Sequence, residues 1–369
     1  MTIPLSEMIR WLGEFAPLEL AEPWDNVGLL LGDPDQPVRK VMTCLTVTGA
    51  TAAEAIQSGV DLIVSHHPIL FRPVQKIVGG NHETAEVWAL ARAGIAVYSP
   101  HTAFDNAISG INAGLARRLA LVDLKPMRPG APLPHSKIVA FTPEADRGPV
   151  LAAAFAAGAG RIGNYAECSF GAKGQGTFHG DENSSPKVGQ AGTRETVDEW
   201  RLEFVCPACR VEAVVGAIRV AHSYEEPAID VFPLAGGPSG PGSGRIGTLP
   251  DAISLGELAD RVAGLLPTPA VQIVGDRDRT VRRVAICCGA GDDFVPDAAG
   301  QGADVLLTGE ARFHRCLEAE ALGLGLVLPG HHATERPGVE DLAVALEMAF
   351  TSLDVWASRR ETDPVRCPS

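Results

Sequence analysis

The chain has 369 residues, of which 46% are hydrophobic, and its formal net charge is −14. This length favours two or three domains with sizeable cores, and the acidic balance argues against general nucleic-acid binding, which needs a basic surface. No apolar run is long enough to cross a bilayer and residues 1–17 resemble an amphipathic helix more than a signal peptide, so we expect a cytoplasmic protein that does not enter the membrane.

Short apolar runs alternate with helical patterns at both ends of the chain. In the first part, strands are predicted at 38–47, 61–65 and 95–100, and helices at 51–59 and 84–94. In the last part, strands are predicted at 280–289, 303–309 and 324–330, and helices at 311–323 and 338–350. This rhythm is typical of a doubly wound α/β layer arrangement.

Two stretches rich in proline and glycine, Lys125–Pro134 and Pro233–Gly247, are predicted to be linkers. They divide the chain into residues 1–128, 132–236 and 245–369. We expect the first and last segments to be two βα-rich halves of one α/β core, with the middle segment inserted between them.

The middle segment has a different texture. Strands are predicted at 135–143, 197–207 and 228–234, helices at 149–160 and 210–222, and an exposed Gly-rich loop with a short hairpin at 171–192. The resulting β-α-β-β-α-β order indicates a ferredoxin-like α+β domain.

Three predicted strands of the outer segments end in residues that can bind metals. His66 and His67 follow the strand at 61–65, and His101 and Asp105 follow the strand at 95–100. The strand at 324–330 is followed by a third group, which consists of His331, His332 and Glu335. Ligands of open α/β sheets bind outside the carboxyl ends of the strands, so we expect these groups to meet at one rim.

The residue types restrict the chemistry of such a site. Imidazoles with carboxylates suit Zn, Mn, Fe, Co or Ni, and not a thiolate site. Five or six ligands exceed what one tetrahedral ion needs, and could hold two ions about 3.5–4 Å apart, as hydrolytic two-metal sites do. We expect Thr334 to cap a helix whose first residue is Glu335, with Pro337 in its first turn.

Other histidines and cysteines have simpler interpretations. A lone histidine is usually a hydrogen-bonding surface residue, and this applies to His82, His135, His179, His222 and His314. The pair Ser65 and His67 suggests a serine hydrolase, but no GxSxG elbow is present. The eight cysteines are expected to be reduced, and the lone CxxC at Cys206–Cys209 is an unlikely zinc site.

Two further motifs leave alternatives open. The stretch WDNVGLLLG, Trp24–Gly32, is either a turn with Trp24 packed beneath it or part of the rim of the site. Glu310 directly follows a predicted strand, where it is either a partner of a metal ligand or the start of a helix.

Taken together, the motifs WDNVGLLLG, SHHPILFRP, HTAFDNA, AHSYEEPAIDVFPL and GHHATERPGV resemble the Nif-three-like dinuclear-metal family. Members of this family are often labelled GTP cyclohydrolase 1 type 2 homologues. The resemblance extends over nearly the whole chain, and the middle segment resembles the PII- or CutA-like domain that longer bacterial members carry. It also implies a ring-shaped homohexamer.

The family resemblance implies a set of ligands for two divalent ions. These would be His66, His67, Asp105, His331 and Glu335, with Glu335 a bridging candidate. His101 would lie at the rim, as a partner of a ligand or facing the substrate.

The chain departs from the family pattern at three positions. His332 stands where the family usually has Tyr, which leaves open whether His331 or His332 binds, although the i, i+4 spacing to Glu335 favours His331. Thr46 replaces a frequent Asp and Ser223 a usual Pro, and we expect neither to touch a proposed ligand.

Two functions remain open from the sequence. The first is a metal-dependent hydrolase, in which His101 or Glu335 transfers the proton and water opens the purine ring of GTP or attacks a related bond. The second is a non-catalytic metal-binding assembly that senses a small ligand or partner protein through its insert. The sequence names neither the metal nor the substrate.

Overall fold

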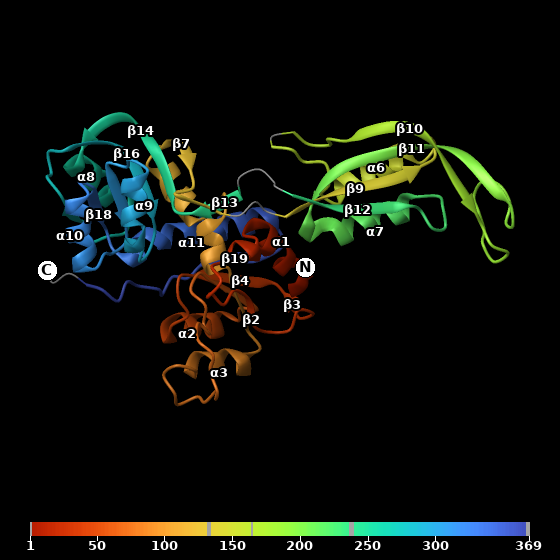
Figure 1. The fold of residues 1–369 in the computed structure, drawn as a ribbon. Helices are drawn as coiled ribbons and strands as arrows, with labels where there is room; N and C mark the ends of the chain where they lie inside the picture. Colours follow the sequence, from red (N-terminus) through yellow and green to blue (C-terminus); the bar gives the residue numbers. More distant parts are fainter. Residues whose placement is uncertain (1, 131–133, 164, 236–239, 367–369) are drawn as a thin grey trace. The chain divides into compact units, whose positions relative to one another are not determined.

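The computed structural model describes residues 2–130, 134–163, 165–235 and 240–366 (Figure 1). The chain has a mixed α/β fold and divides into two compact units. The first unit joins Met1–Ala131 with Pro241–Ser369, and the second consists of Pro132–Gly240. None of the helices within the described residues has the length and apolar content needed to cross a membrane.

The first unit contains a five-stranded sheet in the order β19-β4-β5-β6-β2. Its strands are β2 (Gly28–Leu31), β4 (Lys40–Cys44), β5 (Leu62–Ser65), β6 (Ala96–Ser99) and β19 (Asp354–Ala357). All neighbours are parallel except β2, which pairs antiparallel with β6 at the edge. The four parallel strands are therefore linked by crossovers, two of which contain α2 (Gly49–Ser58) and α3 (Ala85–Ala93).

A second sheet of the same unit has six strands in the order β15-β18-β17-β16-β14-β7. They are β7 (Val122–Lys125), β14 (Arg245–Ser254), β15 (Gln272–Val274), β16 (Thr280–Cys287), β17 (Val305–Thr308) and β18 (Gly325–Leu328). The strands β16, β17 and β18 are parallel, and their helices are α8 (Leu255–Leu265), α9 (Val295–Gly300) and α10 (Phe313–Ala321). A capping box of Ser254 and Glu257 begins α8.

One hydrophobic core joins these two sheets. Buried residues of the first sheet, such as Val41 and Leu62, belong to the same cluster as Val284 and Leu307 of the second. The remaining helices of the unit are α1 (Leu5–Phe15), α4 (His101–Asn106), α5 (Ile111–Arg118) and α11 (His331–Ala349). Because α11 packs against α5, β4 and β19, it connects the C-terminal part of the chain to the N-terminal sheet.

Short elements complete the first unit. Two small sheets pair β1 (Ile3–Pro4) with β3 (Pro37–Val38), and β8 (Arg128–Gly130) with β13 (Gly240–Ser243). The two predicted linkers therefore contain short strands. Their backbone groups pair even though proline and glycine dominate their sequence. Residues 131–133 and 236–239 of these linkers lie outside the described residues. One-turn 3₁₀ helices occur at Leu18–Leu20, Ala208–Arg210 (in the second unit) and Asp292–Phe294.

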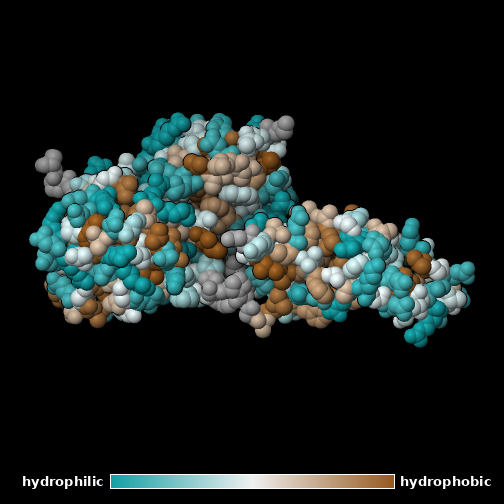
Figure 2. Space-filling view, turned by 90° about the horizontal axis from the view of Figure 1, so that it is seen from above, coloured by the Kyte–Doolittle hydropathy of each residue, from teal (hydrophilic) through white to brown (hydrophobic). Residues whose placement is uncertain are grey.

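The second unit is a four-stranded antiparallel sheet with two helices. Its elements are β9 (His135–Thr142), α6 (Arg147–Ala156), β10 (Phe170–His179), β11 (Arg194–Pro207), α7 (Val211–Ala221) and β12 (Ile229–Leu234). The strand order is β10-β11-β9-β12, and residues of α6 and α7 share one core with those of β9 and β11. Hydrophilic residues cover much of the molecular face in Figure 2, between scattered hydrophobic patches.

The prediction of an exposed loop with a short hairpin over residues 171–192 is right about the hairpin, but the hairpin is longer than predicted. The segment Phe170–His179 is a strand that pairs over its full length with β11. Glycines at 171, 174 and 176 gave the segment low strand propensity, but the ladder to β11 supplies partners for its backbone. Local propensity is therefore outweighed here by pairing with a long neighbouring strand.

Candidate metal centre

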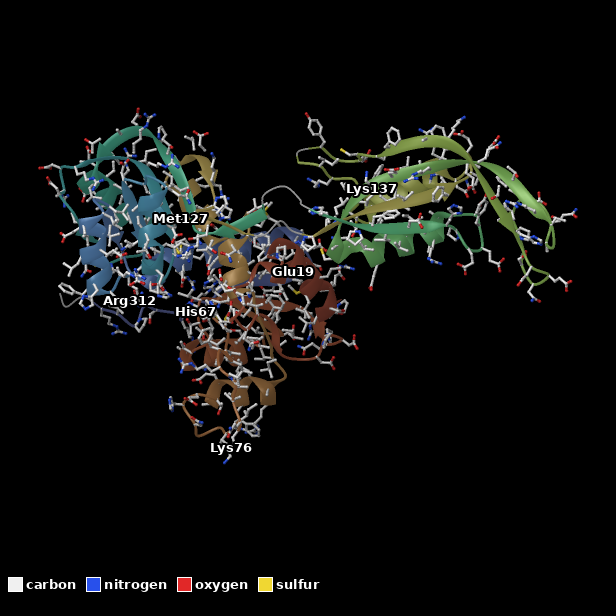
Figure 3. The ribbon with its side chains drawn as sticks, viewed as in Figure 1. Glu19, His67, Lys76, Met127, Lys137 and Arg312 are labelled. Atoms are coloured by element: carbon white, nitrogen blue, oxygen red, sulfur yellow. The ribbon has the colours of Figure 1, made fainter. Side chains whose placement is uncertain are left out.

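Three strands of the first unit end beside the predicted ligands. His66 and His67 directly follow β5, and their backbone N–H groups donate to carbonyls at the end of β4, 2.9 and 2.8 Å away. His101 begins α4 shortly after β6, and Asp105 follows one turn later in the same helix. In Figure 3, His67 lies where the N-terminal and C-terminal parts of this unit meet.

The third group lies on α11. This helix begins at His331, after Gly330 with a φ of 107°, and not after Thr334 as predicted. Thr334 does not cap the helix start, because its hydroxyl accepts from Gly289 N at 2.9 Å and donates to the carbonyl of His331 at 2.9 Å. Pro337 consequently lies inside the helix. His331 and Glu335 are thus one turn apart on the same face.

The three groups converge around the carboxylate of Glu335. Its oxygens lie 3.8 Å from Nε2 of His66, 3.2 Å from Nε2 of His67 and 3.0 Å from Nε2 of His331. Nε2 of His66 lies 3.6 Å from an Asp105 oxygen. All five residues predicted as ligands therefore lie within one cluster, which joins both halves of the first unit.

Two sets of three side chains place their ligand atoms within 4.8 Å of one another. One set is His67, His331 and Glu335, and the other is His66, His67 and His101. His101 is therefore close enough to be a ligand itself. His67 belongs to both sets, so two cation positions in this cluster would be adjacent.

Buried polar atoms of the cluster lack hydrogen-bond partners. These atoms are both ring nitrogens of His66, Nε2 of His331, one oxygen of Asp105 and one oxygen of Glu335. A buried polar group without a partner costs free energy, and most such groups in proteins are paired. Convergent imidazole nitrogens and carboxylate oxygens are the donor set of a transition-metal site, so these residues fit divalent cations.

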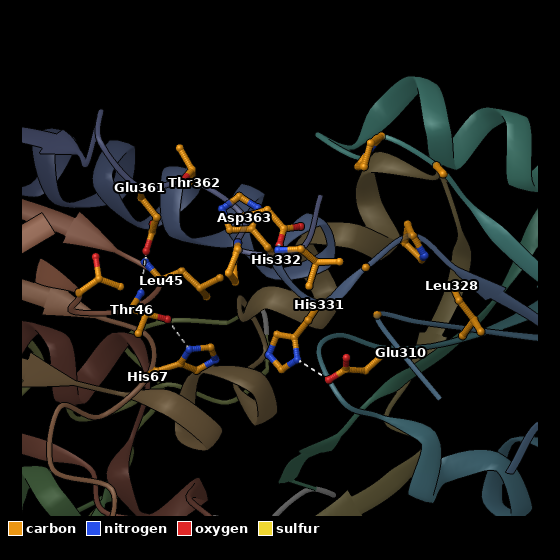
Figure 4. Close-up of a pocket in the computed structure, with 18 of the residues that line it drawn as sticks. Leu45, Thr46, His67, Glu310, Leu328, His331, His332, Glu361, Thr362 and Asp363 are labelled. Atoms are coloured by element: carbon orange, nitrogen blue, oxygen red, sulfur yellow. Dashed lines mark hydrogen bonds and ion pairs between the residues drawn. The ribbon is translucent and has the colours of Figure 1, made fainter. Parts of the chain in front are cut away.

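Contacts with further side chains orient two of the imidazoles. Oγ1 of Thr46 lies 2.7 Å from Nδ1 of His67, and Oε1 of Glu310 lies 3.0 Å from Nδ1 of His331 (Figure 4). The prediction that Thr46 touches no proposed ligand is therefore wrong. Glu310 contacts His331, a predicted ligand, and is not a helix start, because α10 begins only at Phe313. Such partners fix the orientation of metal-binding imidazoles.

His101 is held in an uncommon conformation. Its φ is 30°, and its Nδ1 lies 2.8 and 2.9 Å from the two oxygens of Asp25. Asp25 also accepts from the backbone N–H of Thr102 at 3.1 Å and from its hydroxyl. Non-glycine residues with positive φ carry strain that persists where surrounding contacts hold them, often at functional sites. These bonds leave Nε2 of His101 directed away from Asp25.

Burial and neighbouring charges shift the pKa values within the cluster. Burial lowers the pKa of His66 well below its usual value, and burial with the nearby Glu335 raises the pKa of Asp105 to about 8. Contact with Glu335 raises the pKa of His331 to about 9. Burial alone would raise the pKa of Glu335, but its contacts with His331 and His67 outweigh this and lower it far below the usual range. The contact with Glu335 favours the protonated form of His331, and a cation that binds His331 would displace this proton.

Hydrogen bonds also lower the pKa of Asp25, the partner of His101. Burial alone would raise the pKa of Asp25, but hydrogen bonds from His101 and Thr102 lower it to about 2. Asp25 is therefore an anion that fixes one ring nitrogen of His101.

A pocket with a volume of about 610 Å³ opens beside the cluster. Its wall includes His67, His331, His332 and the segment from Arg360 to Val365 (Figure 4). Glu361 fixes this segment, because its carboxylate accepts from the backbone N–H groups of Leu45 and Thr46 at 2.8 and 2.7 Å. This volume is within the range of small-molecule sites.

His332 is not part of either three-residue set. Both of its ring nitrogens are buried without a partner, and it lines the pocket beside His331. Among the two adjacent histidines, the structure therefore brings His331 and not His332 to Glu335.

Other predictions for polar residues have mixed outcomes. Ser65 donates to the carbonyl of His67 at 2.9 Å and so takes part in shaping the loop. His222 was expected at the surface but is buried, with Nε2 2.9 Å from the carbonyl of Phe141. Cys206 and Cys209 form no disulfide with each other. Trp24 is 62% exposed and is therefore not packed beneath its turn.

Comparisons with known proteins find one family over almost the whole chain. The family model of Duf34/NIF3 (NGG1p interacting factor 3) matches residues 3–364. A Mycobacterium tuberculosis protein named GTP cyclohydrolase 1 type 2 homolog is 38% identical over 371 residues, which cover 99% of this chain and 97% of the relative. A Bacillus subtilis protein of the same name is 37% identical over 362 residues, which cover 97% of both chains.

A solved structure gives the same result for the fold. The crystal structure of a Bacillus cereus protein related to NIF3 superposes with a TM-score of 0.87 at 34% identity, and the match covers 99% of each chain. A Staphylococcus aureus protein matches with a TM-score of 0.71 at 27% identity over 99% of each chain. The family resemblance predicted from the sequence motifs is confirmed.

Proposed function

Because this chain belongs to the Duf34/NIF3 family, we propose that it is a metal-dependent hydrolase whose centre holds two divalent cations. The observation that supports this proposal is the convergence of buried, unpartnered nitrogen and oxygen atoms at the strand ends of the first unit. Five side chains would supply the ligands: His66, His67, Asp105, His331 and Glu335. Zn, Fe, Mn, Co or Ni would suit this set.

The side chains of the cluster would have different roles in this reaction. Two bound cations would supply Lewis acidity and lower the pKa of a water molecule. Glu335, which lies within 3.8 Å of three imidazoles, would bridge the two positions. His101 would transfer the proton through Nε2, since Asp25 holds its Nδ1. Glu335 is the second residue suited to carry that proton.

The names of the relatives suggest a substrate for this chemistry. In GTP, the water would add to C8 of the purine and the C8–N9 bond would break, which opens the five-membered ring. The experiment is turnover of GTP, phosphoesters and cyclic amides by metal-loaded protein. We expect His67→Ala to abolish turnover and the exposed His82→Ala to leave it unchanged. Equal rates for His67→Ala and the unmodified protein would remove the proposal.

A second candidate function is a non-catalytic metal-binding assembly. The strand order β10-β11-β9-β12 of the second unit supports a ferredoxin-like, PII- or CutA-like insert, a fold class that often serves regulation. In that case residues 132–236 would bind a small ligand or a partner protein, and the chain would form a homohexamer. A large loss of thermal stability with chelator, together with no turnover of any compound tested, would favour this function.

A further inference from the structure

We propose that Trp24 and Phe71 form a subsite that holds a flat heteroaromatic ring of the substrate beside the metal centre. This inference rests on the proposed function and narrows its substrate class. It assigns a role to two exposed aromatic residues next to His101. The proposed hydrolysis does not otherwise use these two residues.

Three rings meet at this edge of the cluster. The centroids of Trp24 and Phe71 are 6.0 Å apart, and each lies near the ring of His101, at 6.3 and 6.1 Å. The ring of His101 in turn lies 5.2 Å from that of His66 and 5.6 Å from that of His67. The ring of His101 therefore contacts both these aromatic side chains and the rings of two proposed ligands.

The two aromatic side chains remain largely open to solvent. Trp24 is 62% exposed and Phe71 47% exposed, although large aromatic residues usually bury most of their area. A single exposed hydrophobic residue needs no explanation. Two that contact each other and a strained histidine at a candidate metal centre indicate a binding surface.

Adjacent residues of the same turn fix this surface without a ligand. Asp25 holds His101 and Thr102, and the side-chain amide of Asn26 donates to the carbonyl of Leu70. Each member of the Trp24-Asp25-Asn26 triplet thus contacts the neighbouring loops at a different point, and Leu70 directly precedes Phe71. A rigid, preformed surface loses little freedom when a ligand binds.

Flat π-systems are the chemical class that this surface recognises best. Aromatic rings prefer offset-stacked or edge-to-face contacts, and stacking of a nucleic-acid base on an aromatic side chain is tolerant of base identity. Removal of one such side chain typically weakens binding by roughly 5- to 150-fold. A cyclic amide with a saturated carbon–carbon bond has no aromatic ring, and its binding should not depend on Trp24.

The experiment measures binding of guanosine and of dihydrouracil to metal-loaded protein by calorimetry. The variants are Trp24→Ala, Trp24→Phe, Phe71→Leu and the control Trp88→Ala, which removes an exposed tryptophan from α3. We expect Trp24→Ala to weaken guanosine binding by roughly 5- to 150-fold. Trp24→Phe should retain most of the affinity, and Trp88→Ala all of it. Dihydrouracil binding and metal content should not change.

Equal guanosine affinity in Trp24→Ala and the unmodified protein would overturn the subsite, as would no guanosine binding by the unmodified protein. If Trp24→Ala loses metal, the subsite is tested with Phe71→Leu instead. Full guanosine affinity of Phe71→Leu at full metal content would then overturn the subsite. Tryptophan-dependent binding without turnover of any compound would contradict the hydrolase and leave the subsite intact. Turnover together with binding that does not depend on Trp24 would contradict the subsite and leave the hydrolase intact.

Discussion

Two buried glutamates of the first unit, Glu54 and Glu335, have opposite surroundings. Both are 5% exposed. Glu54 accepts from the hydroxyl of Ser358 at 2.6 Å and from the backbone N–H groups of Arg359 and Arg360 at 3.0 and 3.1 Å. Its oxygens are satisfied by fixed donors of the protein.

One oxygen of Glu335 lies 3.2 Å from Nε2 of His67 and 3.0 Å from Nε2 of His331, and neither contact has the geometry of a hydrogen bond. Burial of a carboxylate therefore does not by itself indicate a metal site. What distinguishes the two is whether the protein itself supplies the donors. We interpret Glu54 as structural and Glu335 as a residue whose environment is completed by a cation.

The largest expected effect tests the cation side of this comparison. Glu335→Gln should lower metal affinity by more than about 100-fold, because loss of a residue that only orients a ligand already costs roughly 10- to 100-fold. Metal content after dialysis against buffered metal, measured by elemental analysis, gives the result. Glu340→Gln removes an exposed carboxylate from the same helix and should keep full metal content. Unchanged metal in Glu335→Gln would contradict the comparison.

The structural side is tested by Glu54→Ala. Its loss leaves a hydroxyl and two backbone N–H groups without their acceptor, so the free energy of unfolding should fall by about 2–4 kcal/mol. Urea denaturation measures the change, and Glu347→Ala on the exposed face of α11 should leave stability within about 0.5 kcal/mol. Metal content should stay the same in both variants. If Glu54→Ala loses metal while remaining folded, the two glutamates are not functionally distinct.

A smaller effect concerns Thr46, which orients one ligand. Thr46→Val removes the oxygen that lies 2.7 Å from Nδ1 of His67 and should weaken metal binding by roughly 10- to 100-fold. Thr46→Ser keeps the hydroxyl and should retain affinity near that of the unmodified protein. Metal titration with a competing chelator measures both, and equal affinity for Val and Thr at this position would exclude an orienting role.

The smallest effect is a pH dependence of stability. Burial alone would raise the pKa of Glu54, but hydrogen bonds from Ser358, Arg359 and Arg360 outweigh burial and lower it. A carboxyl group with a lowered pKa in the folded state stabilises the protein above its unfolded pKa, and this contribution is lost as the pH falls through the lowered value. The stability difference between the unmodified protein and Glu54→Gln should therefore shrink on acidification. A constant difference in thermal midpoint from neutral to acid pH would contradict this.

The positions of the three proposed histidine ligands follow from the sequence because each lies at, or shortly after, the end of an apolar strand. His66 and His67 come directly after β5, and His331 comes three residues after the end of β18 in the other sheet. Ligands of open α/β sheets bind outside such strand ends. Apolar periodicity locates such ends well. The family motifs then identify which of the neighbouring polar residues belong together.

The contacts that orient the ligands could not be predicted in the same way. Asp25 and His101 are 76 positions apart, and Thr46 meets His67 from a different strand. These contacts depend on sheet register and side-chain direction, which no local pattern specifies. The start of α11 was also misplaced, because Thr334 resembles a helix cap and yet bonds Gly289, 45 positions away.

The place of β19 in the first sheet has a consequence for biosynthesis. Asp354 pairs in parallel with Lys40, so one side of β4 is covered by a strand that is synthesised 314 residues later. Until then, β4 has an open edge, and exposed strand edges are templates for wrong association. The N-terminal sheet therefore stays incomplete until residues 354–357 have been synthesised. Expression yield should therefore depend on how well that edge is protected during the interval.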